Sequence, residues 1–403
     1  MDRKESMAQH LFIKLLDTYI TDARIRFTID GRSIIVGKCP QSGNEDETVA
    51  TVRINQKRFF SRVLCYGNLG MGEAFMDEDF DIVKGTLHNF LTVLLRNRLA
   101  DKTGRDLRLA SSILMMRLLS NLRGKKRNVR FHYDIGDDLF EAFLDQTMTY
   151  SCGYANSPGD SLEELQLNKL DRICRKLRLR PGDHILDIGC GFGGLLIYAA
   201  KNHGVSGLGI TISKNQYERA NNTILKQGLA DRVRVELKDF RSVGGEFDKV
   251  VSVGMLEHVP RSQYSDYFKT VSRVLKPEGS GLIHCIGCGT VKNRHDPFIQ
   301  RYIFPGSNQP KLSEIADSLE RNCLAILDVE NIKLHYAYTV LEWLGRFQSN
   351  AHALNTAKYD SRFKRMWEYY FSCGIAAAFA SDSAVYQVLF TKHAVGEAPL
   401  RRV

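Results

Sequence analysis

The segment His184-Ile-Leu-Asp-Ile-Gly-Cys-Gly-Phe-Gly-Gly194 decides the fold of this chain. An apolar run ends in an acid, the chain passes through closely spaced glycines, and Leu195-Leu-Ile-Tyr-Ala-Ala200 then has the pattern of a helix. Because glycine has no Cβ, a strand–turn–helix of this kind lets the backbone come close to a bound ligand. Nucleotide-binding folds of several chemistries share such a turn, so the residues beyond it must distinguish between them.

From residue 131 onward, strand and helix patterns alternate. Strands are predicted at His184–Ile188, Val205–Ile210, Val233–Leu237, Lys249–Val253, Leu282–Ile286, Ala325–Ile332 and Val385–Thr391. Helices are predicted at Glu163–Leu177, Leu195–Lys201, Lys214–Gln227 and Tyr264–Leu275. This alternation predicts an α/β fold with a doubly wound, Rossmann-like sheet. A mostly helical insert at about Tyr338 to Ala380 would act as a lid over the ligand crevice.

The first part of the chain predicts a smaller α+β domain, residues 1–122. Its expected strands are Ala23–Ile29, Ser33–Val36, Val49–Ile54 and Phe59–Tyr66, and its expected helices are Leu11–Leu16, Leu87–Leu99 and Leu107–Leu119. A basic linker, residues 123–130, leads to a catalytic domain at 131–403. This linker is either a solvated connector or a contact with lipid phosphates.

Composition narrows the possible partners and the location. The formal net charge of +10, from 56 basic and 46 acidic residues, favours an anionic partner such as nucleic acid or an anionic lipid surface, unless it is a solvated face. No run approaches the roughly 18 apolar residues of a spanning helix, and the charged start does not resemble a signal peptide. We therefore expect a cytoplasmic protein. The odd number of cysteines, nine, favours reduced thiols, and Cys285 with Cys288 lacks a second pair, so no metal site is expected.

The ends of the second and third strands bear on the ligand. A NAD-binding unit places an acid after its second strand, whereas this chain has the hydroxyls and amide of Thr211, Ser213 and Gln216 there. Asp187 suits the cationic amino group of a methionine-type ligand. Asp239, followed by Phe240, could meet an adenine amino group. The combination fits S-adenosylmethionine better than NAD.

Three polar groups stand in segments that otherwise have the pattern of buried structure. Cys152 could be a small buried hydrophobe, Glu257 an acid at a helix start, and His284 a hydrogen-bonded core histidine. All three fall near the carboxyl ends of strands or just before the first one. Ligands of this fold bind in that region, which favours a shared site.

The ordered motifs resemble those of the cyclopropane-fatty-acyl-phospholipid synthases and the mycolic-acid cyclopropane synthases. The motifs are His132-Tyr-Asp-Ile-Gly136, Met148-Thr-Tyr-Ser-Cys152, Leu186-Asp-Ile-Gly-Cys-Gly191, Thr211-Ile-Ser-Lys-Asn-Gln216, Met255-Leu-Glu-His258 and His284-Cys-Ile-Gly287. Gly72-Glu-Ala-Phe-Met-Asp77 is similar to a segment in the N-terminal domain of the longer members. The resemblance covers about residues 60–395. It implies an enzyme that uses S-adenosylmethionine to modify unsaturated acyl chains.

The resemblance also implies residue roles and partners. Residues at the matching positions would bind S-adenosylmethionine: Tyr150, Ser151, Gly189, Gly191, Thr211 and Gln216, with Asp187, Gly193, Ser213, Asp239 and Phe240 beside them. A bicarbonate ion would be held by Cys152, Glu257, His284, Ile286 and Tyr336. The larger bacterial members are dimeric peripheral membrane enzymes. We therefore expect a homodimer at the inner face of the membrane, acting on unsaturated phospholipid and not on nucleic acid.

Some features depart from the family or leave the outcome open. Cys373 is a candidate for the family's C-terminal active-site cysteine, but Phe379 is followed by Ala380 where the family has an arginine. Methyl transfer to an alkene leaves a carbocation. Loss of a proton from the new methyl carbon closes a cyclopropane ring, whereas loss of a proton elsewhere, or reduction of the cation, gives a methylene or methyl branch. Two alternatives are a methyltransferase for a small metabolite or RNA, and a non-catalytic lipid-binding protein.

Overall fold

The computed structural model describes residues 3–38, 47–105, 111, 113–114, 136–290 and 295–392. Its contacts divide the chain into two compact units. The first comprises Met1–Gly136, Asp296–Pro305 and Phe347–Ser381, and the second comprises Asp137–His295, Gly306–Arg346 and Asp382–Val403. The predicted basic linker, residues 123–130, lies outside the described residues.

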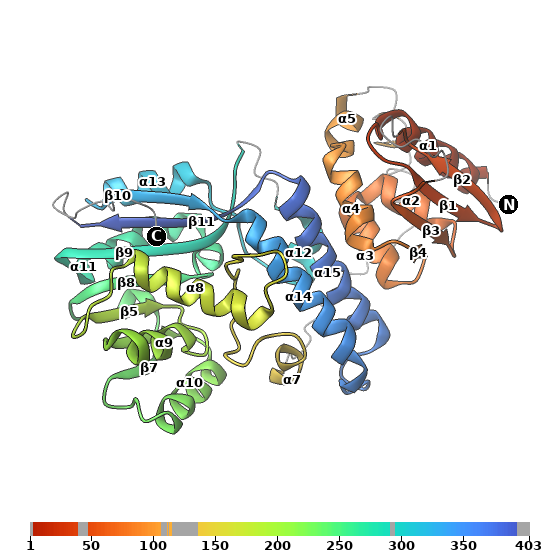
Figure 1. The fold of residues 1–403 in the computed structure, drawn as a ribbon. Coiled ribbons are helices and arrows are strands. Elements are labelled where there is room, and N and C mark those ends of the chain that lie inside the picture. Colours follow the sequence, from red (N-terminus) through yellow and green to blue (C-terminus); the bar gives the residue numbers. More distant parts are fainter. Residues whose placement is uncertain are drawn as a thin grey trace. The chain divides into compact units, whose positions relative to one another are not determined.

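The second unit contains a seven-stranded mixed sheet with the order β10-β11-β9-β8-β5-β6-β7 (Figure 1). Its strands are β5 (His184–Ile188), β6 (Ser206–Thr211), β7 (Val233–Leu237), β8 (Phe247–Val253), β9 (Leu275–Cys288), β10 (Ala325–Asn331) and β11 (Ser383–Thr391). Its helices are α7 (Asp137–Glu141), α8 (Leu162–Lys176), α9 (Gly194–His203), α10 (Lys214–Lys226), α11 (Tyr264–Val274), α13 (Leu312–Arg321) and most of α14 (Lys333–Asn350). β11 runs antiparallel to both of its neighbours, β9 and β10. The predicted doubly wound α/β sheet is confirmed, with this one reversed strand.

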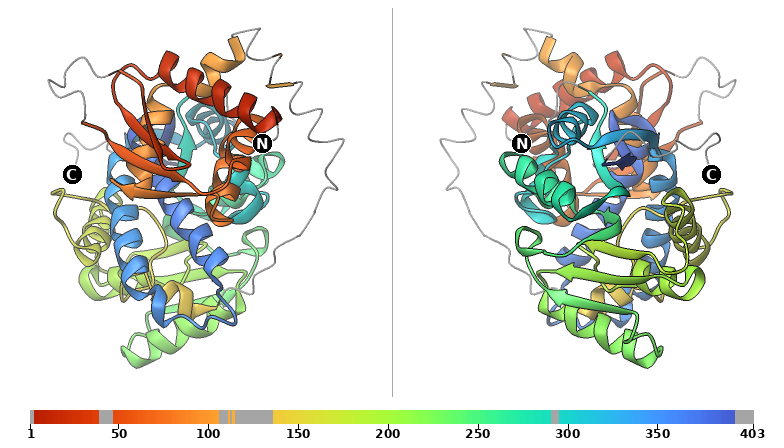
Figure 2. Two further views of the ribbon diagram at one scale, coloured as in Figure 1. Left: turned by 90° about the vertical axis from the view of Figure 1, so that its right-hand side faces the viewer. Right: turned by 90° about the vertical axis from the view of Figure 1, so that its left-hand side faces the viewer.

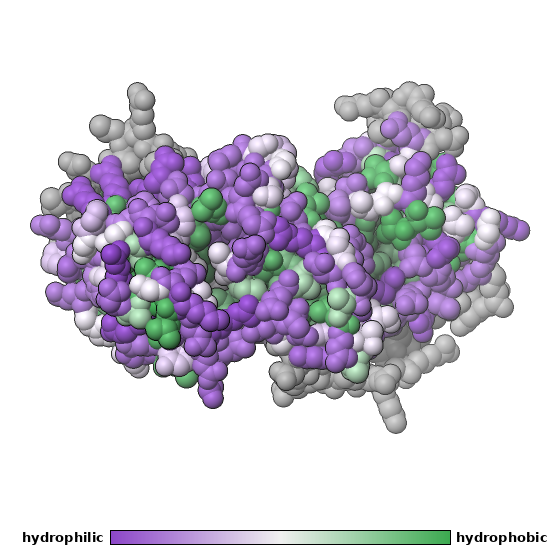
Figure 3. All heavy atoms as spheres, turned by 60° about the horizontal axis from the view of Figure 1, so that its bottom comes forward, coloured by the Kyte–Doolittle hydropathy of each residue, from purple (hydrophilic) through white to green (hydrophobic). Residues whose placement is uncertain are grey.

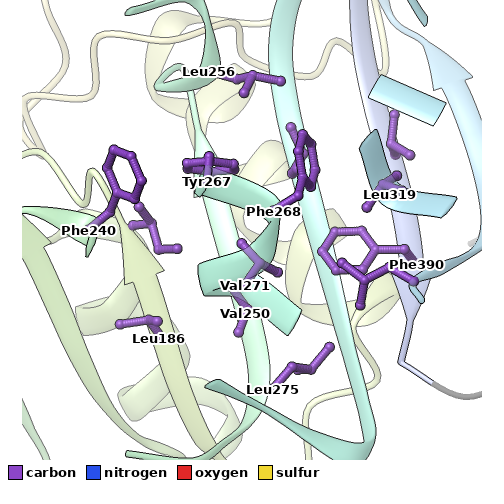
Figure 4. Packing of buried hydrophobic residues seen from close by; sticks show 14 of the residues in the cluster. Leu186, Phe240, Val250, Leu256, Tyr267, Phe268, Val271, Leu275, Leu319 and Phe390 are labelled. Carbon is purple, nitrogen blue, oxygen red and sulfur yellow. The ribbon is translucent and has the colours of Figure 1, made fainter. Parts of the chain in front are cut away.

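Apolar strands buried on both faces explain why helices cover both sides of this sheet (Figures 1 and 2). On one face, Ile173 of α8, Leu196 of α9 and Ile224 of α10 share a core cluster. On the other face, Phe268 of α11 and Leu319 of α13 pack with strand residues such as those in Figure 4. The two clusters fix the sheet between its helical layers and so fix the strand ends that carry the site.

The glycine turn after β5 has the backbone that the sequence predicts. Gly189, Gly191 and Gly193 have φ angles of 79°, 56° and 80°, which residues with a Cβ rarely adopt. A Cβ on Gly189 would also lie 2.6 Å from Cγ of Met255. Gly193 is the residue before α9, so the turn leads directly into the helix.

The first unit contains a four-stranded sheet with the order β2-β1-β3-β4. Its strands are β1 (Ile25–Ile29), β2 (Arg32–Val36), β3 (Ala50–Ile54) and β4 (Phe80–Lys84). Its helices are α1 (Arg3–Tyr19), α2 (Arg58–Tyr66), α3 (Asn68–Met76), α4 (Leu87–Arg96), α5 (Leu99–Arg105), α12 (Pro297–Tyr302) and α15 (Ser361–Ala380). The strand expected at Phe59–Tyr66 is wrong, because this segment is α2. Its buried Phe59, Phe60 and Leu64 share one helical face, while Arg58 and Arg62 pair with Asp79.

The helical insert expected between the last strands is divided between the two units. α15 packs against α3 and α4 of the first unit. Arg362 donates to Asp77 at 2.8 Å, and Arg365 donates to Phe80 O and Asp81 Oδ1, each at 3.0 Å. Most of α14 belongs to the second unit. That the insert covers the ligand crevice stays a prediction.

The described surface is largely hydrophilic on the face in Figure 3, with scattered apolar side chains. Among the described residues, no helix combines the length and the apolar character needed to cross a bilayer.

Candidate active site

Asp187 lies in β5 immediately before the glycine turn and is almost fully buried. Its Oδ1 has no hydrogen-bond partner among the described residues. Burial raises the pKa of this carboxyl to about 7, and the charge of Lys169 partly opposes that rise. A buried acceptor without a partner is costly unless a ligand supplies a donor, so Asp187 is suited to a cationic or N–H group.

Lys169 is a site residue that the sequence analysis missed. It projects from α8, is 1% exposed, and donates to Ser151 Oγ at 2.9 Å and Gln166 Oε1 at 2.7 Å. Gln166 in turn donates to Ser151 O at 3.0 Å. Burial lowers the pKa of Lys169 to about 8, and the carboxylates of Asp145 and Asp187 oppose that fall. The lysine therefore holds the Ser151 segment against α8 and places a positive charge near Asp187.

The segment before Ser151 is held by Asp145 and by aromatic packing. Asp145 accepts from the backbone N–H groups of Thr147 at 2.9 Å and Thr149 at 3.0 Å. The ring of Tyr150 packs 5.2 Å from that of Trp343, between centroids. These contacts place Tyr150 and Ser151 beside α14 and α8.

The ends of β6 and β7 hold the other residues predicted for cofactor binding. Thr211 Oγ1 donates to Gln216 Oε1 at 2.7 Å, and Ser213 accepts from Gln216 N as the N-cap of α10. Asp239 caps the short 3₁₀ helix η1 (Phe240–Ser242) by accepting from Arg241 N. It also accepts two hydrogen bonds from the Arg241 guanidinium, and these bonds lower the pKa of Asp239. Phe240 is buried against Tyr267. The cofactor roles of these residues stay predictions.

A second cluster forms around Cys152, Ile286 and Tyr336, which pack together with Ile332 and Val385. Gly153 N donates to Thr339 Oγ1 at 3.0 Å, so the Cys152 segment is bound to α14, the helix that carries Tyr336. Burial raises the pKa of the Cys152 thiol to about 12, so the thiol is neutral. Cys152 is thus suited to packing rather than to nucleophilic attack.

Glu257 joins this cluster through the backbone of Ile286. It lies in η2 (Leu256–His258) after β8, and its Oε1 accepts from Ile286 N at 2.5 Å. Its Oε2 is buried and has no partner among the described residues. Burial raises the pKa of Glu257 to about 7, and the bond from Ile286 N opposes that rise.

His284 lies on the same face of β9 as Ile286, because alternate residues of a strand share a face. It is 2% exposed, and its Nε2 has no partner among the described residues. Burial lowers the pKa of His284 to about 3, with Lys169 and Lys176 adding to the effect. The ring is therefore neutral.

Cys373 belongs to the first unit. It receives a hydrogen bond from Asn68 Nδ2 at 3.8 Å, and desolvation raises the pKa of its thiol well above the ordinary range. The structure does not place it among the contacts of Cys152, Glu257 and His284, so its predicted catalytic role stays a prediction.

The second unit therefore brings three buried, unpaired polar atoms to the carboxyl side of β5, β8 and β9: Asp187 Oδ1, Glu257 Oε2 and His284 Nε2. Within the described part of the chain, no group of three or more His, Cys, Asp or Glu side chains could hold a metal ion.

Comparison with known proteins assigns the family. Residues 120–388 match the family described as mycolic acid cyclopropane synthetase. The chain belongs to this family.

Relatives in the cyclopropane synthetase family are similar over most of this chain. A cyclopropane-fatty-acyl-phospholipid synthase of Escherichia coli (strain K12) is 40% identical over 348 residues, which cover 85% of this chain and 88% of the relative. The tuberculostearic acid methyltransferase UfaA1 of Mycobacterium tuberculosis is 33% identical, covering 81% of this chain and 79% of the relative. The solved mycolic acid cyclopropane synthase CmaA1, complexed with SAH and CTAB, is 29% identical with a TM-score of 0.60, covering 66% of this chain and 99% of that chain.

Proposed function

We propose that this chain is an S-adenosylmethionine-dependent cyclopropane-fatty-acyl-phospholipid synthase. It transfers a methyl group to the double bond of an unsaturated acyl chain in a phospholipid and closes a cyclopropane ring. The family and the 40% identity to the Escherichia coli synthase support the activity. The observation that carries the proposal is that Asp187 in β5, Glu257 after β8 and His284 in β9 each bury a polar atom that has no partner among the described residues.

The residues present fit S-adenosylmethionine, whose sulfonium supplies an electrophilic methyl group. Asp187 Oδ1 is a buried acceptor for the ligand's ammonium group, which would lower the raised pKa of this carboxyl. Gly189 and Gly191 leave the backbone free of side chains at the turn. Ser151, Thr211 and Gln216 supply further polar groups on neighbouring segments. A relative of this family was solved with SAH, the demethylated form of this cofactor.

The residues also fit a bicarbonate ion. Glu257 Oε2 can accept a hydrogen bond and His284 Nε2 can donate one, while bicarbonate carries both a hydroxyl and acceptor oxygens. Tyr336 and Cys152 pack beside Ile286, whose N–H fixes Glu257. Once held there, the ion supplies a base for the proton that ring closure releases.

The chain's own contribution is positioning and exclusion of water. An alkene is a weak nucleophile, so the double bond and the methyl group must be held in line, which can lower a barrier by about 7–11 kcal/mol. The apolar surroundings of Ile286, Ile332 and Val385 keep water from the carbocation that forms on the acyl chain. Glu257 and His284 would hold the anion beside the new methyl group, where it would accept the proton released as the C–H electron pair closes the ring. No side chain needs to act as a covalent nucleophile.

One alternative product is favoured by a specific comparison. The relative named tuberculostearic acid methyltransferase is 33% identical over 81% of this chain. The same site would then give a methylene branch if a proton were lost so that a new double bond formed, whereas a methyl branch would also need an external hydride donor. The residues that hold the methyl donor would be the same for both outcomes.

Lipid analysis tests the proposal. The purified chain is incubated with S-adenosylmethionine, bicarbonate and vesicles of monounsaturated phospholipid, and the acyl chains are analysed by mass spectrometry and proton NMR. We expect a gain of one CH2 unit with the high-field signals of ring protons. A CH2 gain with olefinic protons indicates a methylene branch, and two further hydrogens indicate a methyl branch. No mass gain on any unsaturated phospholipid would overturn the proposal.

We also propose that the enzyme works as a homodimer on the inner face of the membrane. The net charge of +10 supports attraction to anionic lipid. Light scattering of the purified chain tests the dimer, and a monomer mass at assay concentrations contradicts it.

A further inference from the structure

A chain of hydrogen bonds leads from a buried lysine to His284. Lys176 of α8 donates to Gln387 Oε1 at 2.7 Å and to Glu330 Oε2 at 2.6 Å. Gln387 of β11 lies opposite His284 of β9, and its Nε2 is 3.3 Å from His284 Nδ1. Lys176, Gln387 and His284 are all buried, so these contacts do not compete with bulk water.

The direction of each of these hydrogen bonds follows from Lys176, which is the first donor. A lysine ammonium only donates, so the oxygen of Gln387 must face Lys176 and its NH2 group must face His284. Nδ1 of His284 is then the acceptor. A neutral imidazole carries one proton, and that proton must be on Nε2.

The charge of Lys176 is itself secured by Glu330. Glu330 also accepts from Arg172 at 2.9 Å, and the two cations lower the pKa of this carboxyl. Burial lowers the pKa of Lys176, and the hydrogen bond and charge of Glu330 oppose that fall and favour the ammonium form. The Lys176 side chain is thus an ammonium, which cannot accept a hydrogen bond from Gln387.

We propose that Gln387 is a positioning residue: with Lys176, it holds His284 as the tautomer whose Nε2–H is offered as a donor to the anion that the proposed function requires. This inference rests on the proposed function for the identity of the anion. His284 then orients the anion and does not take the proton released on ring closure. Glu257, the acceptor on the other side, and His284, the donor, together select an ion that carries both a hydroxyl and an acceptor oxygen.

The tautomer is tested directly by NMR of the full chain labelled with 15N at histidine. His284→Asn identifies the signals of His284 by their loss. We expect a pyridine-type Nδ1 and a pyrrole-type Nε2 in the wild type. In Gln387→Glu, the new carboxylate accepts from both Lys176 and the ring, so we expect the proton to move to Nδ1. A pyrrole-type Nδ1 in the wild type, or an unchanged ring in Gln387→Glu, would overturn the inference.

Kinetics provide the second measurement. We expect Gln387→Glu to raise the bicarbonate concentration for half-maximal rate by about tenfold or more, with the KM for S-adenosylmethionine within about twofold of wild type. A merely structural defect would move both constants. The matched control is Tyr386→Phe, at the residue before Gln387 on β11, whose hydroxyl donates to Cys288 O at 3.5 Å. We expect this control to change neither the His284 signals nor the bicarbonate dependence, and an equal effect in both variants would contradict a specific role of Gln387.

The two proposals fail in different ways. A wild type that shows the expected tautomer but converts no unsaturated phospholipid supports the tautomer assignment and overturns only the proposed function. An active enzyme with the opposite tautomer overturns only the role of Gln387.

Discussion

The buried environments of Glu257, His284 and Cys152 give these three residues of the candidate site different chemical properties. Each is buried, yet Glu257 keeps an unpaired acceptor, His284 keeps an unpaired ring nitrogen, and Cys152 is a neutral thiol. The sequence predicted these three because Glu257 and His284 stand where strands end, Cys152 stands before the first strand of the sheet, and their motifs resemble those of a known family; their roles stay predictions. The sequence did not predict Lys169 and Gln387. A lysine in an amphipathic helix and a glutamine in an apolar strand do not indicate a site until their hydrogen-bond partners are known.

Glu257→Gln tests the anion site. We expect turnover to fall by about a hundredfold or more, because the variant loses the acceptor that holds the base, while affinity for SAH stays within about twofold. Methyl-transfer assays and calorimetric titration with SAH measure the two effects. Glu236→Gln, at an ion pair with Lys238, is the control. Turnover within twofold of wild type would contradict the assignment.

The pH dependence of stability gives an independent test of Glu257. Its pKa is raised from the ordinary 4.5 to about 7, so the folded protein holds this proton more tightly than the unfolded chain. Unfolding therefore releases a proton between these values, and stability falls as pH rises through that window. We expect Glu257→Gln to match wild type near pH 4.5 and to be more stable by about 1–3 kcal/mol above pH 7. Urea unfolding in buffer free of bicarbonate measures the free energy of unfolding of both proteins. If it changed with pH in the same way in wild type and variant, the raised pKa of Glu257 would be contradicted.

Lys169→Met tests the residue that the sequence analysis missed. The variant leaves Ser151 and Gln166 without their donor and removes the cation near Asp187. We expect affinity for SAH to fall by about tenfold or more. Lys201→Met on the exposed side of α9 is the control and should bind as wild type does. Equal affinities in all three proteins would show that Lys169 does not support the cofactor segment.

At the scale of elements, the sequence predicted every strand of the seven-stranded sheet. Central strands such as β5 and β11 are apolar because they are buried on both faces, whereas the edge strand β7 alternates apolar and charged residues. The same rule failed at α2. Its apolar residues are as dense as those of a strand, and the pairing of Arg58 and Arg62 with Asp79, which marks the helix, is a tertiary contact. The division of the insert between α14 and α15 was equally unpredictable, because it depends on contacts with α3 and α4.

Arg365→Lys tests how α15 is held in the first unit. Arg365 donates to Phe80 O and to Asp81, and its guanidinium stacks over the ring of Phe75 at 3.9 Å. Lysine cannot reproduce this planar set of donors, so we expect the free energy of unfolding of this unit to fall by about 1–3 kcal/mol.

The chain contains two tryptophans, which allows this loss to be localised. In a Trp343→Phe background, Trp367 of α15 is the sole tryptophan, and its fluorescence follows urea unfolding of the first unit. Lys364→Met on the same helix is the control, with an expected change below about 0.5 kcal/mol. Indistinguishable midpoints for Arg365→Lys and the control would refute the role of Arg365.

At the scale of the whole molecule, the net charge of +10 is the property that bears on the substrate's location. We expect binding to anionic vesicles to weaken as salt rises from about 0.05 M to 0.5 M, because salt screens the attraction. Sedimentation with vesicles of anionic phospholipid measures it, with zwitterionic vesicles as the control. Binding that is independent of salt would rule out the electrostatic explanation.

The first unit is assembled from three separate stretches, the last of which ends at Ser381. During translation, the N-terminal sheet leaves the ribosome long before α15 exists to cover α3 and α4. The unit synthesised first is thus among the last to be completed, and until α15 is made the apolar residues of α3 and α4 that it covers stay accessible to other chains.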